Sequence, residues 1–282
     1  MKNHKIKTIL LCILLFIVVE LLTIPYFSIA RLKTDNPTQT ALMRQRLREA
    51  EADGTPLTIT RRWISLPKVP KHVIDAIIVA EDGTFFEHGG IDWYEVQESM
   101  EKNLDEGRAA RGASTITQQL AKNLYLSTSK DPVRKIKELI ITLLLEKRLT
   151  KNRILELYLN VIEWGRGVFG IEAASELYFG KSASSLSLDE ATRLAAVIPS
   201  PLRHRPDIDS RYVLRRKLIV LRRMSARNFI VHTTSEDTSS RQHIEEQGQP
   251  VVSSGLPETS LQPADTTETD TTETERDENN GL

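Results

Sequence analysis

The sequence of 282 residues contains one cysteine, Cys12, which lies inside an apolar stretch near the N-terminus. A single cysteine excludes an intrachain disulfide, and it also excludes zinc sites built on paired cysteines. The chain has no internal repeat, and few of its segments alternate between apolar and polar residues. These absences argue against a disulfide-stapled fold, a repeat array and a sheet-dominated fold, so helices are expected to carry most of the structure.

Net charge is absent too, because 38 basic and 38 acidic side chains cancel. The two signs are unevenly placed, since residues 235–282 hold 12 acidic and 2 basic side chains. The rest keeps 38 less 2, or 36 basic, and 38 less 12, or 26 acidic, a net charge of +10. This balance suits an anionic partner such as a phosphate, a diphosphate or a lipid surface, although ordinary solvated charge gives the same count.

An apolar segment from Thr8 to Ala30 is long enough to cross a hydrocarbon core of roughly 30 Å as a helix. Lysines within residues 1–7 favour a cytoplasmic N-terminus, so everything after the span is expected outside the cytoplasm. Glu20 is costly at that depth, and Pro25 is expected to kink the helix. A cleaved signal peptide is the alternative, but the cleavage site is poor, so an uncleaved single-pass anchor over 8–30 is favoured.

The remaining chain divides by composition. Residues 31–60 are mostly polar and are expected to form a stalk or the start of the folded part. Helical periodicity then extends over 61–232, the predicted folded domain, with a loop expected over 95–111. Residues 233–282 are predicted to be a disordered acidic tail, because they cannot bury enough apolar area to offset chain entropy.

The first candidate functional residue lies at a predicted helix end. Apolar residues within 73–80 share one helix face, and Gly83 is the expected stop. Glu81 then falls in the last turn, where the helix dipole and the phenylalanines at 85–86 raise its proton affinity. That suits a general base, while a solvated helix end is the alternative.

An amide-rich helix follows. Thr115 with Gln118 fits a capping box, which predicts a helix that starts just after Ser114. Polar residues then recur on one face, namely Gln118, Gln119, Lys122 and Asn123. Such a face suits sugar hydroxyls and phosphate oxygens, and the helix N-terminus suits an anion. A merely polar surface explains the pattern equally well.

Cations surround a carboxylate on a third helix, for which Asp131-Pro132 is a good start. Arg134 and Glu138 are four residues apart on one side, next to Lys135. They form either a surface ion pair or a diphosphate clamp, with Glu138 as a candidate ligand for a divalent cation, Mg or Mn. No organic cofactor is indicated. The expected buried face consists of Ile136, Leu139, Ile140, Leu143 and Leu144.

These segments together resemble the glycosyltransferase family 51 domain, the peptidoglycan glycosyltransferase domain, over about 63–224. The matching motifs are 81–88, 112–123, 134–138, 154–160 with 178–181, and 188–201. Five motifs in order are a specific signal. No K-T-G follows the S-x-x-K at 127–130, and the chain is too short for a transpeptidase domain, so it resembles the monofunctional form of the family.

The resemblance implies a mostly α fold with a lysozyme-like large lobe and a small membrane-proximal jaw lobe, preceded by one transmembrane helix. It implies inverting glycosyl transfer that polymerises lipid II into β-1,4-linked peptidoglycan strands and releases undecaprenyl diphosphate, for cell-wall biogenesis and cell shape. Lipid II, the lipid-linked glycan chain and membrane lipids are then the partners, on the periplasmic side of the cytoplasmic membrane. Other cell-wall or division proteins are candidate partners, and no nucleic acid is expected.

The resemblance also assigns roles to residues. Glu81 matches the first catalytic glutamate, the base for the acceptor 4-hydroxyl. Glu138 matches the second, which acts through a divalent ion or by orienting the cations. The candidate substrate-binding residues are Asp82, His88, Ser114, Gln118, Gln119, Lys122, Asn123, Arg134 and Lys135.

Two other functions stay open at this point. A lysozyme-like fold with a glutamate also suits a lytic transglycosylase, although cleavage of glycan requires no diphosphate site. The second is a non-catalytic division scaffold whose acidic tail recruits partners.

Overall fold

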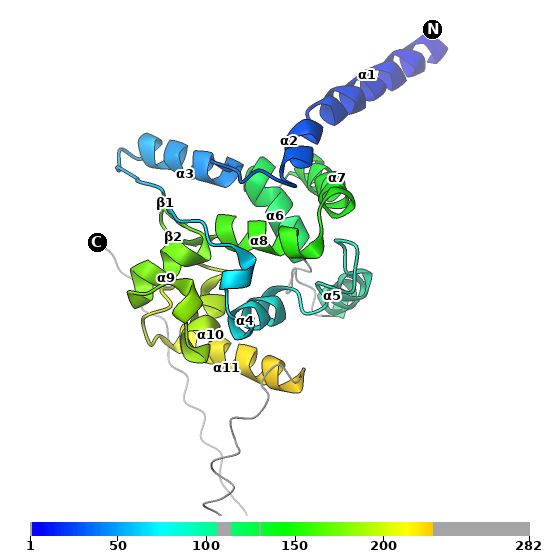
Figure 1. The fold of residues 1–282 in the computed structure, drawn as a ribbon. Coiled ribbons are helices and arrows are strands. Elements are labelled where there is room, and N and C mark those ends of the chain that lie inside the picture. The colour runs from blue at the N-terminus through cyan, green and yellow to red at the C-terminus, as the bar shows by residue number, and fades with distance from the viewer. Residues whose placement is uncertain (1, 106–113, 130, 228–282) are drawn as a thin grey trace, which may run out of the picture. The chain divides into compact units, whose positions relative to one another are not determined.

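The computed structural model describes residues 2–105, 114–129 and 131–227, so the predicted tail over 233–282 lies outside the described residues. Helices make up most of the described chain, and three short strands form one small sheet (Figure 1). The expected mostly α fold with few strands is therefore confirmed, while the division into a lysozyme-like lobe and a jaw lobe stays a prediction.

The helices are α1 (Lys2–Leu22), α2 (Tyr26–Arg31), α3 (Ala41–Ala52), α4 (Lys71–Glu81), α5 (Trp93–Asp105), α6 (Ile116–Tyr125), α7 (Pro132–Arg148), α8 (Lys151–Val161), α9 (Ile171–Phe179), α10 (Leu188–Val197) and α11 (Arg211–Ala226). Two 3-10 turns are η1 (Leu66–Lys68) and η2 (Ala183–Ser185). The strands β1 (Thr60–Arg61), β2 (Glu163–Gly165) and β3 (Val168–Phe169) lie in the order β1-β3-β2, with β1 parallel and β2 antiparallel to β3.

Side-chain caps determine where several helices begin. The Thr115 hydroxyl accepts from the Gln118 backbone N–H at 3.2 Å, and the Gln118 side chain accepts from the Thr115 N–H at 3.1 Å. These reciprocal bonds satisfy two donors that the first turn of α6 leaves unpaired, which confirms the predicted capping box. Asp131 caps α7 with a single bond, in which its side chain accepts from the Val133 backbone N–H at 3.0 Å, and Pro132 is the first residue of the helix.

The centre of the domain is α8, which is buried on nearly every side (Figure 1). Its residues from Ile154 to Val161 are buried apart from Glu156, and α8 contacts α6, α7, α9 and η1. Its Tyr158 is completely buried, as is Trp164 just after it. Helix α10 packs against both α4 and α11, so the helices that carry the candidate residues rest on one continuous core.

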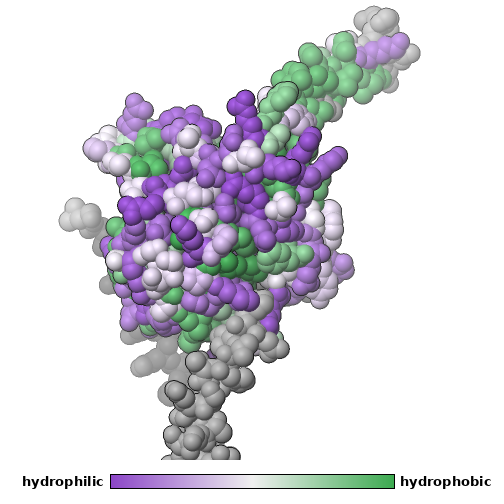
Figure 2. All heavy atoms as spheres, viewed as in Figure 1, coloured by the Kyte–Doolittle hydropathy of each residue, from purple (hydrophilic) through white to green (hydrophobic). Residues whose placement is uncertain are grey.

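The N-terminal helix α1 is a separate apolar rod (Figures 1 and 2). Among the described residues, one stretch, Lys5–Arg31, is long and apolar enough to cross a membrane, and this fits the predicted anchor. The predicted kink at Pro25 is confirmed, because helical structure stops at Leu22 and resumes at Tyr26. Glu20, the costly charge of the span, forms an ion pair with Lys137 of α7.

The base of the anchor belongs to the folded domain. Ile24, Ile29 and Leu32 are buried in the main hydrophobic core. Arg153 of α8 donates to the Leu32 carbonyl at 2.8 Å, which fixes the chain just after α2. Residues 24–32 are therefore part of the packed structure, and only α1 projects from it.

The prediction for the buried face of α7 is wrong in part, although Ile140 and Leu144 are partly buried and pack against the main core as expected. Its buried residues are Glu138, Ile141, Thr142 and Leu145, whereas Ile136 and Leu143 are 59% and 49% exposed. Glu138 tolerates burial because both of its carboxylate oxygens accept hydrogen bonds from cations. Thr142 tolerates burial because its hydroxyl donates to the Glu138 backbone carbonyl. The helix has apolar residues on several sides, and an apolar stripe is left at the surface.

The expected loop over 95–111 is helical through Asp105. Asp92 is responsible for the start of α5, because its side chain accepts from the Glu95 backbone N–H at 2.9 Å.

Replacement of Ile29 by alanine tests whether the base of the anchor is part of the core. Ile29 is 1% exposed, so its truncation is expected to lower the free energy of unfolding by roughly 2–5 kcal/mol. Phe27→Ala is the matched control, because Phe27 is 89% exposed on the same short helix. Denaturant unfolding of both variants in detergent gives the comparison, and equal stabilities would refute the packed base.

Candidate active site

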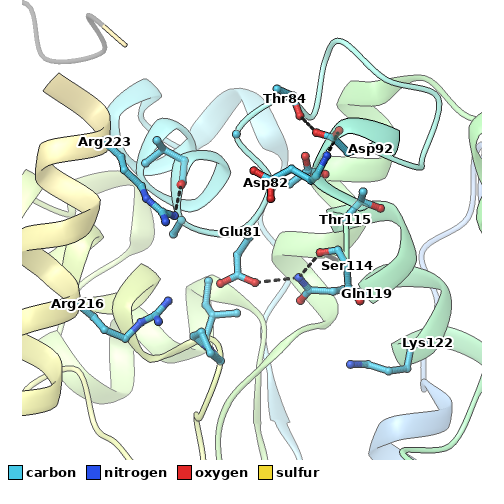
Figure 3. Close-up of a pocket in the computed structure, with 16 residues that line it drawn as sticks. Glu81, Asp82, Thr84, Asp92, Ser114, Thr115, Gln119, Lys122, Arg216 and Arg223 are labelled. Carbon is cyan, nitrogen blue, oxygen red and sulfur yellow. Dashed lines mark hydrogen bonds between the residues drawn. The ribbon is translucent and has the colours of Figure 1, made fainter. Parts of the chain in front are cut away.

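The described residues enclose a pocket of about 580 Å³ between the C-terminus of α4, the N-terminus of α6 and one side of α11 (Figure 3). It is lined by Val79, Ala80, Glu81, Asp82, Gly83, Thr84, Asp92, Glu95, Ser114, Thr115, Gln119, Lys122, Ile198, Pro199, Arg216 and Arg223. The pocket therefore joins residues about 140 positions apart in the sequence, with one carboxylate, Glu81, pointing into its middle.

Glu81 is the last residue of α4, at the helix end that the sequence predicted. The cap is Asp82 rather than Gly83, which has no left-handed conformation. Burial raises the pKa of the Glu81 carboxyl, while a hydrogen bond from Gln119 and the charges of Arg216 and Lys122 lower it. Burial prevails, so this carboxyl binds a proton more readily than an exposed glutamate does.

The Gln119 amide connects Glu81 to the core. Its nitrogen donates to Glu81 Oε2 at 2.8 Å (Figure 3), and its oxygen accepts from the Tyr158 hydroxyl at 3.1 Å. Burial raises the pKa of the Tyr158 hydroxyl well above its ordinary value, so this group remains a donor. Because the Tyr158 hydroxyl donates to the amide oxygen, the Gln119 side chain is oriented with its amide nitrogen toward Glu81.

Asp82 and His88 form hydrogen bonds within the protein. Asp82 accepts from the Ile116 backbone N–H and from His88 Nε2, both at 2.9 Å. The Gly90 N–H donates to His88 Nδ1 at 3.0 Å, so the proton of the neutral ring is on Nε2. Asp82 lines the pocket and His88 does not. Substrate contact by either residue stays a prediction, and the bonds indicate that both position the end of α4.

The polar stripe predicted on α6 is divided between pocket and interior. Gln119 and Lys122 line the pocket, as does Ser114 before the helix. Gln118 and Asn123 are buried and do not line it. The capping box turns the Gln118 side chain back to Thr115, so the geometry does not support direct substrate contact by Gln118.

The cationic cluster of α7 lies next to the pocket without lining it. Arg134 donates to Glu138 Oε2 at 2.6 Å, and Lys135 pairs with the other oxygen. Lys122 connects this cluster to the pocket. Burial lowers the pKa of the Lys122 ammonium, the charge of Glu138 opposes this shift, and Arg134 and Lys135 add to it.

The side chains around Glu138 form a poor set of ligands for a metal ion. Both carboxylate oxygens already accept from cations. In the described ranges, no group of three carboxylate, histidine or cysteine side chains is placed to hold an ion. A hard cation such as Mg²⁺ prefers oxygen ligands and would have to displace two positive charges, so no catalytic step is assigned to a metal.

Arg216 and Arg223 are pocket residues that sequence reasoning missed. Both come from α11 and lie on the side of Glu81 opposite Lys122 (Figure 3). Arg223 also donates to the Val79 carbonyl in the last turn of α4, at 3.4 Å. The available signal was charge, because the sequence of α11 contains six basic residues and no acidic one.

Comparisons with known proteins agree with this geometry. The family model described as transglycosylase matches residues 51–225. The chain is 47% identical to a biosynthetic peptidoglycan transglycosylase of Nitrosospira multiformis, over 68% of this chain and 83% of the relative. A protein of the same name from Methylobacillus flagellatus is 44% identical over 67% and 82% of the two chains. A third, from Aromatoleum aromaticum, is 47% identical over 60% and 74%.

Gln119→Leu is expected to raise the pKa of Glu81 further, because the carboxylate loses its hydrogen bond while burial remains. Infrared titration of the carboxyl band, with the spectrum of Glu81→Gln subtracted, gives the midpoint. The control is Gln97→Leu, since Gln97 lies on α5, pairs with Glu101 and does not line the pocket. A midpoint equal to that of the unaltered protein would contradict the amide–carboxylate bond.

Proposed function

Because the chain belongs to the transglycosylase family and is a peptidoglycan glycosyltransferase, we propose that it polymerises lipid II by inverting transfer and releases undecaprenyl diphosphate. The observation that carries this proposal is the place of Glu81 between two sets of cations (Figure 3). Lys122 lies on one side, and Arg216 with Arg223 on the other. An enzyme whose donor and acceptor both carry a lipid diphosphate needs positive charge on both sides of its base.

Glu81 acts as the general base. It takes the proton of the acceptor 4-hydroxyl while that oxygen forms a bond to the anomeric carbon of the donor. The bond between this carbon and the diphosphate oxygen breaks, and the diphosphate leaves with the electron pair. The raised pKa makes Glu81 a stronger base than an exposed glutamate, and Gln119 holds its carboxylate in place.

The side with Lys122 binds the donor. A diphosphate leaves as an anion, so it requires positive charge more than it requires a proton. Lys122 extends into the pocket, and Arg134 and Lys135 form the adjoining cluster. Glu138 keeps this cluster together, because its two oxygens hold Arg134 and Lys135 in one arrangement.

The side with α11 binds the acceptor. Arg216 and Arg223 line this side of the pocket, and in this proposal they bind the diphosphate of the lipid II whose sugar hydroxyl faces Glu81. Ser114 lies at the N-terminus of α6, next to Gln119, where sugar or phosphate oxygens find donors. Two lipid-linked substrates can then approach Glu81 from opposite sides.

Membrane attachment fits these substrates, because both remain in a lipid leaflet. Helix α1 provides the anchor, and the lysines before the apolar run favour a cytoplasmic N-terminus and an extracytoplasmic domain. The exposed stripe of α7 with Ile136 and Leu143 suits contact with membrane lipids, since α7 also contacts α2 at the base of the anchor.

Glu81→Gln is expected to reduce polymerisation by about 10²–10⁴-fold, the usual contribution of a general base. Purified protein is incubated with labelled lipid II in detergent, and the products are separated on a gel. Polymer that muramidase digests identifies glycan strands. Glu87→Gln is a control of the same chemistry at an exposed position outside the pocket lining. Unchanged turnover of Glu81→Gln would refute the base, and soluble muropeptides released from purified sacculi would favour the lytic alternative.

Polymerisation is expected to proceed at the same rate with and without EDTA, because the cations at Glu138 occupy the place of a metal ion. The same gel assay measures the rate after chelation. Loss of activity that Mg²⁺ or Mn²⁺ restores would instead support Glu138 as a metal ligand.

A further inference from the structure

Arg216 differs from the neighbouring cations in its interaction partners. Arg193 and Lys217 both pair with Asp189, so their charges are largely compensated. Arg216 lines the pocket, and its buried Nε has no hydrogen-bond partner within the part of the chain that the structure describes. Its charge still acts on Glu81, whose pKa it lowers. Within the described residues no carboxylate pairs with this guanidinium, which lines the pocket on the side of Glu81.

The described neighbours of Arg216 on this side are aromatic rings. Tyr212 is one helical turn earlier on α11, and the guanidinium carbon of Arg216 lies 5.9 Å from the centre of its ring. The His204 ring, from the segment between α10 and α11, is stacked on Tyr212 with 3.7 Å between centroids and 9° between planes. Tyr212 also packs against the main core, so its ring is fixed from two directions.

We propose that Tyr212, held by His204, is a positioning residue that keeps Arg216 extended toward the acceptor diphosphate. The inference rests on the proposed function for the identity of that anion. An aromatic face attracts a guanidinium without neutralising it, as a carboxylate would. Arginine has many rotamers, and a ring that restricts them before substrate arrives lowers the entropy lost on binding.

The segment that carries His204 also shapes the pocket. Its earlier residues Ile198 and Pro199 line the cavity, and the His204 backbone N–H donates to the Ser200 carbonyl at 3.2 Å. One short segment thus forms part of the pocket wall and supports the ring beside Arg216. The position of the Arg216 guanidinium relative to this pocket wall is therefore fixed.

The test compares the full chain with Tyr212→Leu, Tyr212→Phe, Arg216→Met and the double variant Tyr212→Leu/Arg216→Met. Binding of inorganic diphosphate to each protein in detergent is measured by calorimetry. Tyr212→Leu keeps an apolar side chain against the core, and its thermal midpoint is recorded to verify folding. We expect a loss of affinity of about 3- to 30-fold, the range for a lost ring–guanidinium contact. Tyr212→Phe keeps the ring, so it should bind as the unaltered protein does.

The double variant separates positioning from general damage. If Tyr212 acts through Arg216, Tyr212→Leu has no further effect once Arg216 is methionine. In the polymerisation assay, the same substitution should raise the KM for lipid II more than it lowers kcat. Additive losses in the double variant, or equal losses in Tyr212→Phe and Tyr212→Leu, would overturn the proposal.

Failure of the inference can be distinguished from failure of the proposed function. If the unaltered protein binds diphosphate but makes no polymer from lipid II, the proposed function fails, and the binding series still tests the ring. If the unaltered protein binds no diphosphate, the positioning of Arg216 for that anion is refuted, even where polymer is made.

Discussion

The arrangement of the pocket depends on the hydrogen bonds of the Asp82 carboxylate, which is not the proposed general base. Asp82 accepts from the first backbone N–H of α6 and from His88, and so joins the end of α4 to the start of α6. A negative charge at a helix N-terminus is favourable, and the buried N–H would otherwise lack a partner. Because Glu81 precedes Asp82 and Gln119 lies in the first turn of α6, this junction brings the Glu81 carboxylate to the Gln119 amide. Loss of the junction would separate the base from the group that orients it.

Features that depend on neighbouring residues could be predicted from the sequence. The capping box at Thr115 is confirmed, because a hydroxyl and an amide three residues later are enough to form it. The position of Glu81 at a helix end was predicted from apolar periodicity together with Gly83, although the residue that caps the helix is Asp82. The Arg134–Glu138 pair also formed as expected, since a separation of four residues makes the two side chains neighbours on any helix.

Features that depend on distant parts of the chain could not be predicted in this way. The buried face of α7 is chosen by the helices that pack on it, and Glu138 is acceptable there only because cations satisfy it. Gln118 was predicted to bind substrate, yet an amide at this position serves equally well as the second residue of a capping box, and that is its role here. Arg216 reaches the pocket because α10 holds α11 beside α4, a contact across more than 130 residues that no local spacing encodes.

The burial of Ile24, Ile29 and Leu32 has a consequence for the order in which the molecule assembles. Leu32 receives its hydrogen bond from Arg153, which is 121 residues later in the chain. The segment after α1 is synthesised early, but it contacts α6, α7 and α8, which are synthesised much later. Closing so long a loop is slow and entropically costly. The segment after α1 is therefore expected to dock late in folding. Until it docks, the part of the hydrophobic core that Ile29 covers stays exposed.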